Sequence, residues 1–371
     1  MTEKKKEMKL ETVEILTEEE GLGNLEQTGG QIDEHQTNGQ KKEKKSEVKV
    51  EKEIEKKKKD LKLEDIPGVG AATAEKLRDA GYANLLSVAV ASPGELVEAC
   101  GVGDAVARKM INFVRQKMDM GFESGEDLLK KREMVERIIT GSKALDAIFG
   151  GGIETGAVTE VYGAYGSGKS SLGHQLAANV ALSKEEGGAN GIAVWIDTEG
   201  TLRPEFIKRL AIAKGLDPEK LLKNFKGVRA FNSDHQMLLA EKIEDLINEG
   251  SPIKLVVVDS LMGHFRSEFV GRGTLADRQQ KLNKHMHVLL KLAQNHNIAV
   301  LITNQVMAKP DTFFGDPTEP IGGHIVAHNS TYRVYLRRGK KGTRVAKMVD
   351  APAMPEAEAI FQVTDEGIKD V

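Results

Sequence analysis

The stretch Gly163-Ala164-Tyr165-Gly166-Ser167-Gly168-Lys169-Ser170 decides the fold, because it fits G-x-x-x-x-G-K-[ST] and lies between an apolar strand and an expected helix. Its glycines let the backbone bend so that successive N–H groups converge on phosphate oxygens, where side chains would block the approach. Lys169 adds a positive charge for the β and γ phosphates, and Ser170 offers a hydroxyl to Mg²⁺. The motif therefore predicts a nucleotide-binding P-loop.

Length and composition set the limits of the interpretation. The chain has 371 residues, which suits two or three domains, and its single cysteine, Cys100, rules out an internal disulfide. The formal charge of -3 does not by itself indicate a polyanionic partner, so any nucleic-acid surface must be local. A charged N-terminal region without an apolar signal core, and no apolar run of about 18 residues, predict an intracellular protein with no membrane segment.

Residues 1–60 contain no aromatic residue and include a Lys-rich block from Lys41 to Lys59. Such a segment cannot bury enough apolar surface to fold, so we expect it to be disordered. The basic block could contact DNA or acidic partners through its charge. A solvated tail that aids solubility is the favoured interpretation.

Residues 61–118 show short amphipathic helices separated by glycine-containing turns, which predicts a compact helical domain. The run Ser92-Pro93-Gly94-Glu95 combines an N-cap, a first-turn proline and a capping-box glutamate, so a helix is expected to begin there. A small core is available from Leu63, Ile66, Val69, Leu77, Leu85, Leu86 and Val88.

Two glycine segments in this domain, residues 66–70 (IPGVG) and 101–103 (GVG), each open a helix and resemble the hairpins of a helix-hairpin-helix unit. Exposed N–H groups at such a helix start can meet a DNA phosphate without reading bases. Gly68 and Gly70 are therefore candidate DNA contacts. A plain helical turn is the alternative.

Residues 119–138 are interpreted as a linker. Gly121-Phe122-Glu123-Ser124-Gly125 breaks the pattern, and a charged helix is expected around Glu126 to Arg137. Phe122 is the one aromatic residue of this segment, and it acts either as a local staple or as a docking knob.

Residues 139–371 alternate strands with helices, which predicts an α/β domain with a mainly parallel sheet covered by helices. Strands are expected near residues 157–162, 192–197, 225–231, 254–259 and 298–303. Residues 331–338 and 344–349 alternate apolar and charged positions around Gly339 to Gly342, and they predict an antiparallel extension of the sheet.

Three of these strands end in polar side chains suited to phosphate chemistry. Asp259 ends the apolar run KLVVVD and is expected to hold the Mg²⁺ that Ser170 also touches, with a helix cap as the alternative. Glu199 lies just beyond the strand VWID and suits a general base or a water-orienting carboxylate. Gln305 follows LITN and is a candidate sensor of the γ-phosphate or of the attacking water.

Two further segments have the character of ligand-contacting loops. Residues 307–329 contain two Phe, three Pro and the pair Gly322-Gly323 without helical periodicity, and a loop that long inside a compact domain is expected to be functional. Residues 265–278 place three arginines around a Gly-rich turn, where their guanidinium groups suit phosphate contacts. These arginines are Arg266, Arg272 and Arg278.

Residues from about 61 to 371 resemble the archaeal RadA recombinase family, relatives of RecA. The resemblance rests on the P-loop and on the runs DTEGTLRPE from Asp197, LVVVDS from Leu255, GRGTLADRQQKLNKH from Gly271, NQVMAKPDTFFGDPTEPIGGHIVAH from Asn304 and DAPAMPEAEA from Asp350. It implies a RecA-like ATPase core that binds ATP and Mg²⁺ between neighbouring subunits. It also implies a helical filament, or a ring, that acts on single-stranded and double-stranded DNA in a cytoplasmic, nucleoid-associated setting and exchanges strands.

The resemblance assigns roles to individual residues. It implies that Glu199 is the catalytic carboxylate, acting with Lys169, and that Gln305 links ATP to DNA. His328 would reach the nucleotide across the subunit interface, and the segment from Asp350 to Pro355 would cap a neighbour's ATP. The full set of expected nucleotide contacts is Gly163, Ala164, Tyr165, Gly166, Ser167, Gly168, Lys169, Ser170, Ser171, Arg203, Phe206, His328, Asp350 and Pro355.

The resemblance also implies where DNA and neighbouring subunits bind. Arg266, Arg272 and Arg278 would belong to a first DNA loop. Residues 307–327 match a second DNA loop, in which Gly322 and Gly323 would permit close approach to the strand. Phe122 resembles the aromatic knob that enters the next subunit's pocket.

Three features depart from the family pattern. Ala164 and Ser170 stand where the family usually has an acidic residue and Thr, although Ser keeps the hydroxyl. Phe206 stands where an Arg commonly packs on adenine, and a phenyl ring can also stack on a base. Gly125 replaces the alanine of an F-x-x-A knob motif and weakens the polymerisation argument.

An accessory paralogue that binds ATP only as a structural ligand is the main alternative to an active recombinase. Such paralogues commonly lack the helical N-terminal domain and have degraded DNA loops, whereas this chain retains both. A signalling P-loop ATPase without a DNA role is disfavoured by the same loops.

Overall fold

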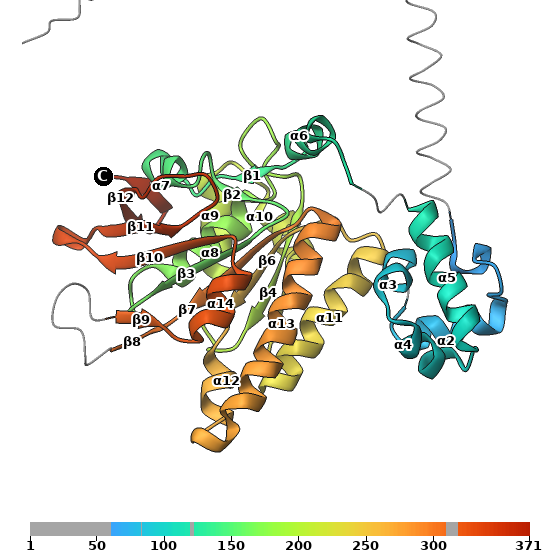
Figure 1. The fold of residues 1–371 in the computed structure, drawn as a ribbon. Coiled ribbons are helices and arrows are strands. Elements are labelled where there is room, and N and C mark those ends of the chain that lie inside the picture. The colour runs from blue at the N-terminus through green and yellow to red at the C-terminus, as the bar shows by residue number, and fades with distance from the viewer. Residues whose placement is uncertain (1–60, 83, 119–121, 309–317) are drawn as a thin grey trace, which may run out of the picture. The chain divides into compact units, whose positions relative to one another are not determined.

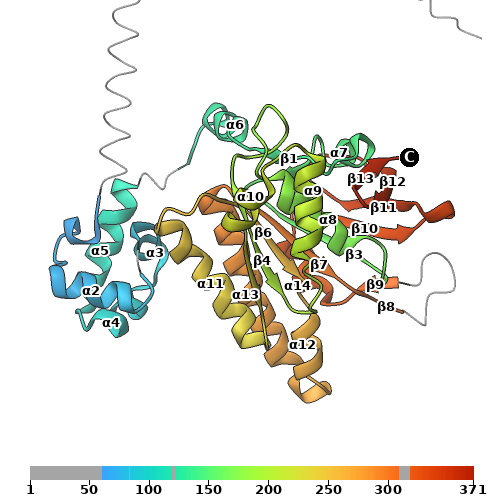
Figure 2. The same ribbon diagram turned by 180° about the vertical axis from the view of Figure 1, so that it is seen from behind.

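The computed structural model describes residues 61–82, 84–118, 122–308 and 318–371, and the chain divides into two compact units, one up to Phe122 and one from Glu123 onward. Figures 1 and 2 show both units. Residues 1–60, for which disorder is predicted, and residues 309–317 within the second predicted DNA loop lie outside the described residues. Among the described residues, no helix combines the length and apolar character needed to cross a membrane.

The N-terminal unit is helical, as predicted. Its elements are the 3₁₀ turn η1 (Leu63–Asp65) and the helices α2 (Ala71–Asp79), α3 (Leu85–Val90), α4 (Pro93–Cys100) and α5 (Asp104–Lys117). The expected start of α4 is confirmed, because the Ser92 hydroxyl accepts the N–H of Glu95 while the Ser92 N–H donates to the Glu95 carboxylate. The predicted core residues are buried except Leu85 and Leu86, which are half-buried.

Both glycine segments precede helices. Gly70 and Gly103 are the N-caps of α2 and α5, and neither supplies a side chain to the first-turn N–H groups. Gly68 has a φ of 89°, a left-handed conformation that glycine adopts without strain. The two predicted helix starts are therefore confirmed, with their first-turn backbone uncapped by side chains.

The C-terminal unit is an α/β domain. Its elements are α6 (Gly125–Glu133), β1 (Arg137–Ile138), α7 (Lys143–Ile148), β2 (Ile153–Glu154), β3 (Val158–Gly163), α8 (Lys169–Asn179), β4 (Ile192–Asp197), α9 (Pro204–Ala213), α10 (Pro218–Asn224), β5 (Lys226–Arg229), α11 (Ser233–Asn248), β6 (Ile253–Asp259), α12 (Gly263–Glu268), η2 (Arg272–Thr274), α13 (Leu275–His296), β7 (Ala299–Asn304), β8 (Val306–Ala308), β9 (Thr318–Pro320), α14 (Gly323–Asn329), β10 (Tyr332–Arg338), η3 (Lys340–Gly342), β11 (Arg344–Asp350), β12 (Glu358–Thr364) and β13 (Gly367–Asp370).

Nine strands form one sheet in the order β13-β12-β11-β10-β3-β7-β6-β4-β5. The strands from β10 to β5 in this order are parallel, and β10 to β13 continue as an antiparallel meander. The predicted fold class is confirmed, and each predicted strand appears within two residues of its expected ends. The strands β12 and β13 were not predicted.

Helices cover both faces of the sheet. Leu255 and Val257 of β6 belong to a core that also contains residues of α7, α8, α9 and α10, whereas Val256 and Val258 face α11, α13 and α14. Figure 1 shows α11, α13 and α14 on the near face, and Figure 2 shows α8 and α9 from the other side. A strand that is apolar on both faces is typical of a doubly covered parallel sheet.

Two expectations about local structure were wrong. Residues 307–329 are not a single loop, because β8 and β9 pair and α14 begins after Gly322, whose φ is 102°. That helix has seven residues and buries only Val326, too little to leave a helical period in the sequence. The charged linker helix α6 ends at Glu133, before the expected Arg137, because Arg137 pairs with Glu154 in the small β1–β2 sheet.

A buried histidine on α13 predicts a pH-dependent stability. His285 stacks on Phe265 at 5.9 Å, and burial lowers the pKa of its imidazole to about 4. The folded state therefore prefers the neutral ring. The contribution of His285 to the free energy of unfolding is complete above pH 6.5 and is lost as the pH falls toward 4, by about 3 kcal/mol at most. We expect the melting temperature to fall more steeply across this range for the wild type than for His285→Gln. If the melting temperature depends on pH equally in the wild type and in His285→Gln, His285 is not the source of this pH dependence.

Candidate functional site

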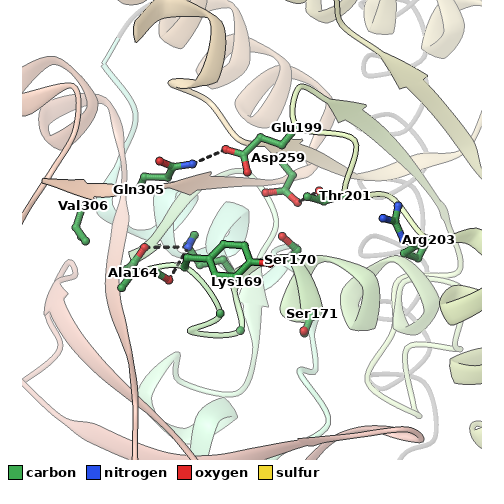
Figure 3. Close-up of a pocket in the computed structure, with 14 residues that line it drawn as sticks. Ala164, Lys169, Ser170, Ser171, Glu199, Thr201, Arg203, Asp259, Gln305 and Val306 are labelled. Atoms are coloured by element: carbon green, nitrogen blue, oxygen red, sulfur yellow. Dashed lines mark hydrogen bonds between the residues drawn. The ribbon is translucent and has the colours of Figure 1, made fainter. Parts of the chain in front are cut away.

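The P-loop, Glu199, Asp259 and Gln305 meet around one cavity of about 470 Å³ (Figure 3). The cavity lies beyond the carboxyl ends of β3, β4, β6 and β7, where parallel sheets bind their ligands. Its lining contains most of the residues that the sequence predicts for a nucleotide. The lining residues are Gly163, Ala164, Tyr165, Gly166, Gly168, Lys169, Ser170, Ser171, Glu199, Thr201, Arg203, Asp259, Gln305 and Val306.

The P-loop backbone has the shape of an anion cradle. Gly166 and Gly168 have φ values of 72° and 106°, which side-chain-bearing residues rarely adopt. A Cβ at Gly163 would lie 2.1 Å from the carbonyl oxygen of Leu336, so this position has no room for a side chain. Since α8 begins at Lys169, its positive end faces the cradle. The loop therefore fits a phosphate group.

The Lys169 ammonium is held at this cradle. Its Nζ donates to the carbonyl oxygens of Gly163 at 2.8 Å and of Ala164 at 3.1 Å. Burial lowers the pKa of Lys169, while the carboxylates of Asp259 and Glu199 act in the opposite direction. Among the residues that the structure describes, no carboxylate lies within hydrogen-bonding distance of Nζ, and a phosphate would supply this opposite charge.

Asp259 is nearly inaccessible, with 2% of its surface exposed. Its Oδ2 accepts the Thr201 hydroxyl at 2.7 Å, and its Oδ1 accepts the Thr303 hydroxyl. Asp259 and Ser170 line the same cavity with oxygen donors, which suit Mg²⁺. Within the described ranges, no three His, Cys, Asp or Glu side chains gather as in an all-protein metal centre. Mg²⁺ is usually bound in proteins by one or two side chains together with phosphate and water oxygens, and Ser170 and Asp259 could supply the side-chain oxygens.

Glu199 connects three strands. Its Oε1 accepts the Ser260 hydroxyl at 2.5 Å and the Gln305 side-chain amide at 2.8 Å, and Figure 3 shows the second of these bonds. Glu199 follows β4, Ser260 follows β6 and Gln305 follows β7. The carboxylate is thus fixed in the cavity lining by a hydroxyl and an amide.

Sequence reasoning missed His174, which lies one helical turn after Ser170 on α8. Its Nδ1 is 2.6 Å from the carbonyl oxygen of Ser170, and its Nε2 accepts the backbone N–H of Arg203 at 2.9 Å. This pair of bonds requires the neutral ring protonated on Nδ1, and burial lowers the pKa of His174 in the same sense. His174 thus ties the P-loop helix to the segment that carries Arg203. In the sequence, the position of His174 four residues after Ser170, on the same face of the expected helix, could have indicated that it lies beside the P-loop.

Several predicted nucleotide contacts do not line the cavity. Phe206 lines a neighbouring open hollow together with Arg203, and the Arg209 guanidinium lies 5.2 Å from the centre of its ring. His328 is on α14, where it stacks with His324 at 5.8 Å. Asp350 and Pro355 are exposed at the end of β11 and beyond it. The roles expected for His328, Asp350 and Pro355 require a neighbouring subunit.

The predicted DNA contacts lie on separate elements. Arg266 is exposed on α12, Arg272 lies in η2, and Arg278 is half-buried on α13. Gly322 precedes α14, and a Cβ there would lie 2.6 Å from Val326 Cγ2 and 3.2 Å from Met262 Sδ. Gly322 is therefore needed for packing as well as for backbone conformation, whereas Gly323 faces open space. Phe122, the predicted knob, is fully exposed.

Two protein-family models match the chain. The model described as Rad51 matches residues 131–371, well over half of the sequence. The chain belongs to the Rad51 family. A second model, the SAM-like helix-hairpin-helix tandem, matches residues 60–116 and thus includes both glycine segments. As a Rad51-family protein, the chain is a RecA-like recombinase of the class that binds ATP and DNA in homologous recombination and repair.

The Rad51 match contains the whole P-loop cavity and both predicted DNA loops. The segment between the two matches, residues 117–130, contains Phe122. Neither match includes Phe122, and its predicted role in polymerisation stays a prediction.

Proposed function

We propose that the protein is an ATP-dependent recombinase of the archaeal RadA type, which forms a filament on single-stranded DNA and pairs it with homologous duplex DNA. The observation that carries this proposal is the bond from Gln305 to Glu199 inside the nucleotide cavity. Gln305 is also the residue that leads from β7 into the second predicted DNA loop. The Glu199 carboxylate, which lines the nucleotide cavity, is thereby hydrogen-bonded to the residue from which the second predicted DNA loop begins.

ATP would be held by the P-loop from Gly163 to Ser171. The hollow lined by Phe206 and Arg209 shares Arg203 with the phosphate cavity and would receive the base. Ser170 and Asp259 would hold Mg²⁺, which supplies neutralisation of charge on the β and γ phosphates. His328 and the segment from Asp350 to Pro355 would complete the site from a neighbouring subunit.

Glu199 would act as the base that orients and deprotonates the attacking water, and Lys169 would stabilise the charge of the phosphoryl group. Ser260 and Gln305 fix the Glu199 carboxylate, so little reorganisation is required of it. Gln305 would report the state of the nucleotide to the DNA loop that follows it.

DNA would be bound through phosphate contacts by Arg266, Arg272 and Arg278 and by the loop that ends at Gly322-Gly323. In the N-terminal unit, the first turn of α2 after Gly68 and Gly70 contains no acidic residue, whereas that of α5 contains Asp104. The Gly68–Gly70 hairpin is therefore the better phosphate contact.

The affinity for DNA should be insensitive to the DNA sequence and should fall as the salt concentration rises. These activities would place the protein on chromosomal DNA in the cytoplasm.

Assembly would use Phe122 as a knob. A cavity of about 600 Å³ beside the sheet-edge strand β5 could receive a neighbour's phenyl ring. Its aliphatic lining includes Val194, Ile196, Val228, Leu239, Ile243 and Leu246, and Lys226, Lys242, Asp245 and Glu249 also line it. An exposed phenylalanine that enters such a cavity contributes about 2 kcal/mol.

We expect Phe122→Ala to weaken each subunit contact by about thirtyfold and to shift the protein toward monomer in light scattering. Ile212→Ala removes another exposed apolar side chain, on α9, and should leave the assembly unchanged. If Phe122→Ala assembles to the same extent as the wild type, Phe122 is not part of the subunit interface.

The proposal is tested by strand exchange between circular single-stranded DNA and homologous linear duplex. Joint molecules should form only with ATP and only with homologous duplex. DNA binding without exchange would instead support the accessory paralogue.

A further inference from the structure

Asn304, the last residue of β7, holds both ends of the segment that contains the second predicted DNA loop. Its Oδ1 accepts the backbone N–H of Gln305 at 2.8 Å, and its Nδ2 donates to the carbonyl oxygen of Ile321 at 2.6 Å. The N–H of Ile321 in turn donates to the carbonyl oxygen of Gln305 at 3.0 Å. These bonds close the base of the β8–β9 hairpin, where Val306 pairs with Pro320.

Asn304 is itself anchored in the sheet. The same Nδ2 donates to Glu160 Oε1 at 2.8 Å, so both of its hydrogens are used. Glu160 Oε2 accepts Arg333 Nε at 2.8 Å, and Arg333 is the direct neighbour of Glu160 across the parallel strands β3 and β10. Asn304 and Glu160 are fully buried. Buried polar groups joined in this way have one low-energy arrangement, because any displacement leaves a donor or carboxylate unpaired.

Gln305 is fastened at two points. Its side chain donates to Glu199 in the nucleotide cavity, and its backbone is bonded to Asn304 and Ile321. A movement of the Gln305 backbone that follows the nucleotide would reach the hairpin base, because this backbone is bonded to Asn304 and Ile321 and the buried Asn304–Glu160 pair holds the end of β7.

We propose that Asn304 and Glu160 form a clasp that couples the nucleotide cavity to the β8–β9 hairpin, so that Asn304 is a positioning residue for DNA-stimulated ATP hydrolysis. This inference rests on the proposed function. Without the clasp, Gln305 still reaches Glu199 and still accepts the Ile321 N–H, but the hairpin base is no longer held to the buried Glu160. Hydrolysis without DNA then continues, and its stimulation by DNA is lost.

Asn179 provides a matched control for Asn304. It is also fully buried, it donates to a backbone carbonyl, that of Ile139, at 2.7 Å, and it accepts Gln175 Nε2 at 2.9 Å. Asn179 ends α8 and does not line the nucleotide cavity. Asn304→Ala and Asn179→Ala each remove one buried amide, but only the first detaches the hairpin base from Glu160.

The test measures ATP turnover of the full chain with and without saturating poly-dT, together with the KM for ATP and the melting temperature. For Asn304→Ala we expect a stimulation ratio about tenfold below the wild type, with DNA-free turnover and KM within about twofold. Asn179→Ala should lower the melting temperature yet keep the wild-type ratio. Asn304→Ser keeps a hydrogen-bond donor, and we expect it to retain part of the stimulation.

A wild-type stimulation ratio in Asn304→Ala would overturn the clasp. If turnover also falls by the same factor with and without DNA, that result would place Asn304 in the nucleotide site itself. If wild-type turnover does not respond to poly-dT, the proposed function fails instead.

Hydrogen exchange on the wild type tests the clasp without a mutant, and it decides the matter if Asn304→Ala does not fold. Exchange at the Ile321 N–H should slow when a non-hydrolysable ATP analogue is added. An exchange rate at the Ile321 N–H that does not change when the analogue is added would contradict the coupling.

Discussion

Lys169→Ala is expected to abolish ATP-dependent strand exchange. The ammonium is the cation that the P-loop presents to phosphate, and its only hydrogen-bond acceptors given by the structure are the Gly163 and Ala164 carbonyls. Loss of its charge-assisted bonds to a triphosphate costs about 3 kcal/mol, or more than a hundredfold in ATP affinity. Titration with a fluorescent ATP analogue measures the affinity, and joint-molecule formation measures exchange.

The variant should remain folded, because the Lys169 side chain bonds to two carbonyl oxygens of its own P-loop, those of Gly163 at the end of β3 and of Ala164. Lys184→Ala is a suitable control, since Lys184 pairs with Glu136 away from the cavity and is 59% exposed. Full strand exchange by a well-folded Lys169→Ala protein would exclude the P-loop from the mechanism.

Glu199→Gln is expected to separate binding from hydrolysis. The amide oxygen can still accept the Ser260 hydroxyl and the Gln305 amide, so the local geometry is preserved. It cannot take a proton from water, and loss of a general base slows turnover by about 10²- to 10⁴-fold. ATP and DNA binding should stay close to wild type, so complexes on DNA should persist longer.

Phosphate release in a stopped-flow assay measures this loss directly. Glu219→Gln changes an exposed carboxylate, paired with Lys208 on the surface, and should turn over ATP normally. Unchanged turnover in Glu199→Gln would assign the base to another group.

Much of the site could be predicted because its residues follow strand ends. Strand runs that end in Asp259, Asp197 and Asn304 are read from hydrophobicity alone, and a parallel sheet brings their carboxyl ends together. The P-loop pattern then fixes which edge binds phosphate.

The roles of His174 and Glu160 could not be predicted in this way. Both depend on partners distant in the sequence: His174 accepts from Arg203, and Glu160 bonds to Asn304 and Arg333. A single polar residue in an apolar strand or helix does not reveal its partner. The strand β12 was missed because Ile360, an exposed position between the buried Ala359 and Phe361, is apolar and hides the alternation, and β13 because it has only four residues.

The central claim is that nucleotide hydrolysis and DNA binding are coupled in one protein. The most direct measurement is the ATP turnover of the full chain with and without single-stranded DNA in one buffer, with Lys169→Ala as the inactive reference. The account predicts turnover that rises when single-stranded DNA is added. The same turnover with and without DNA, under conditions in which DNA is bound, would contradict it.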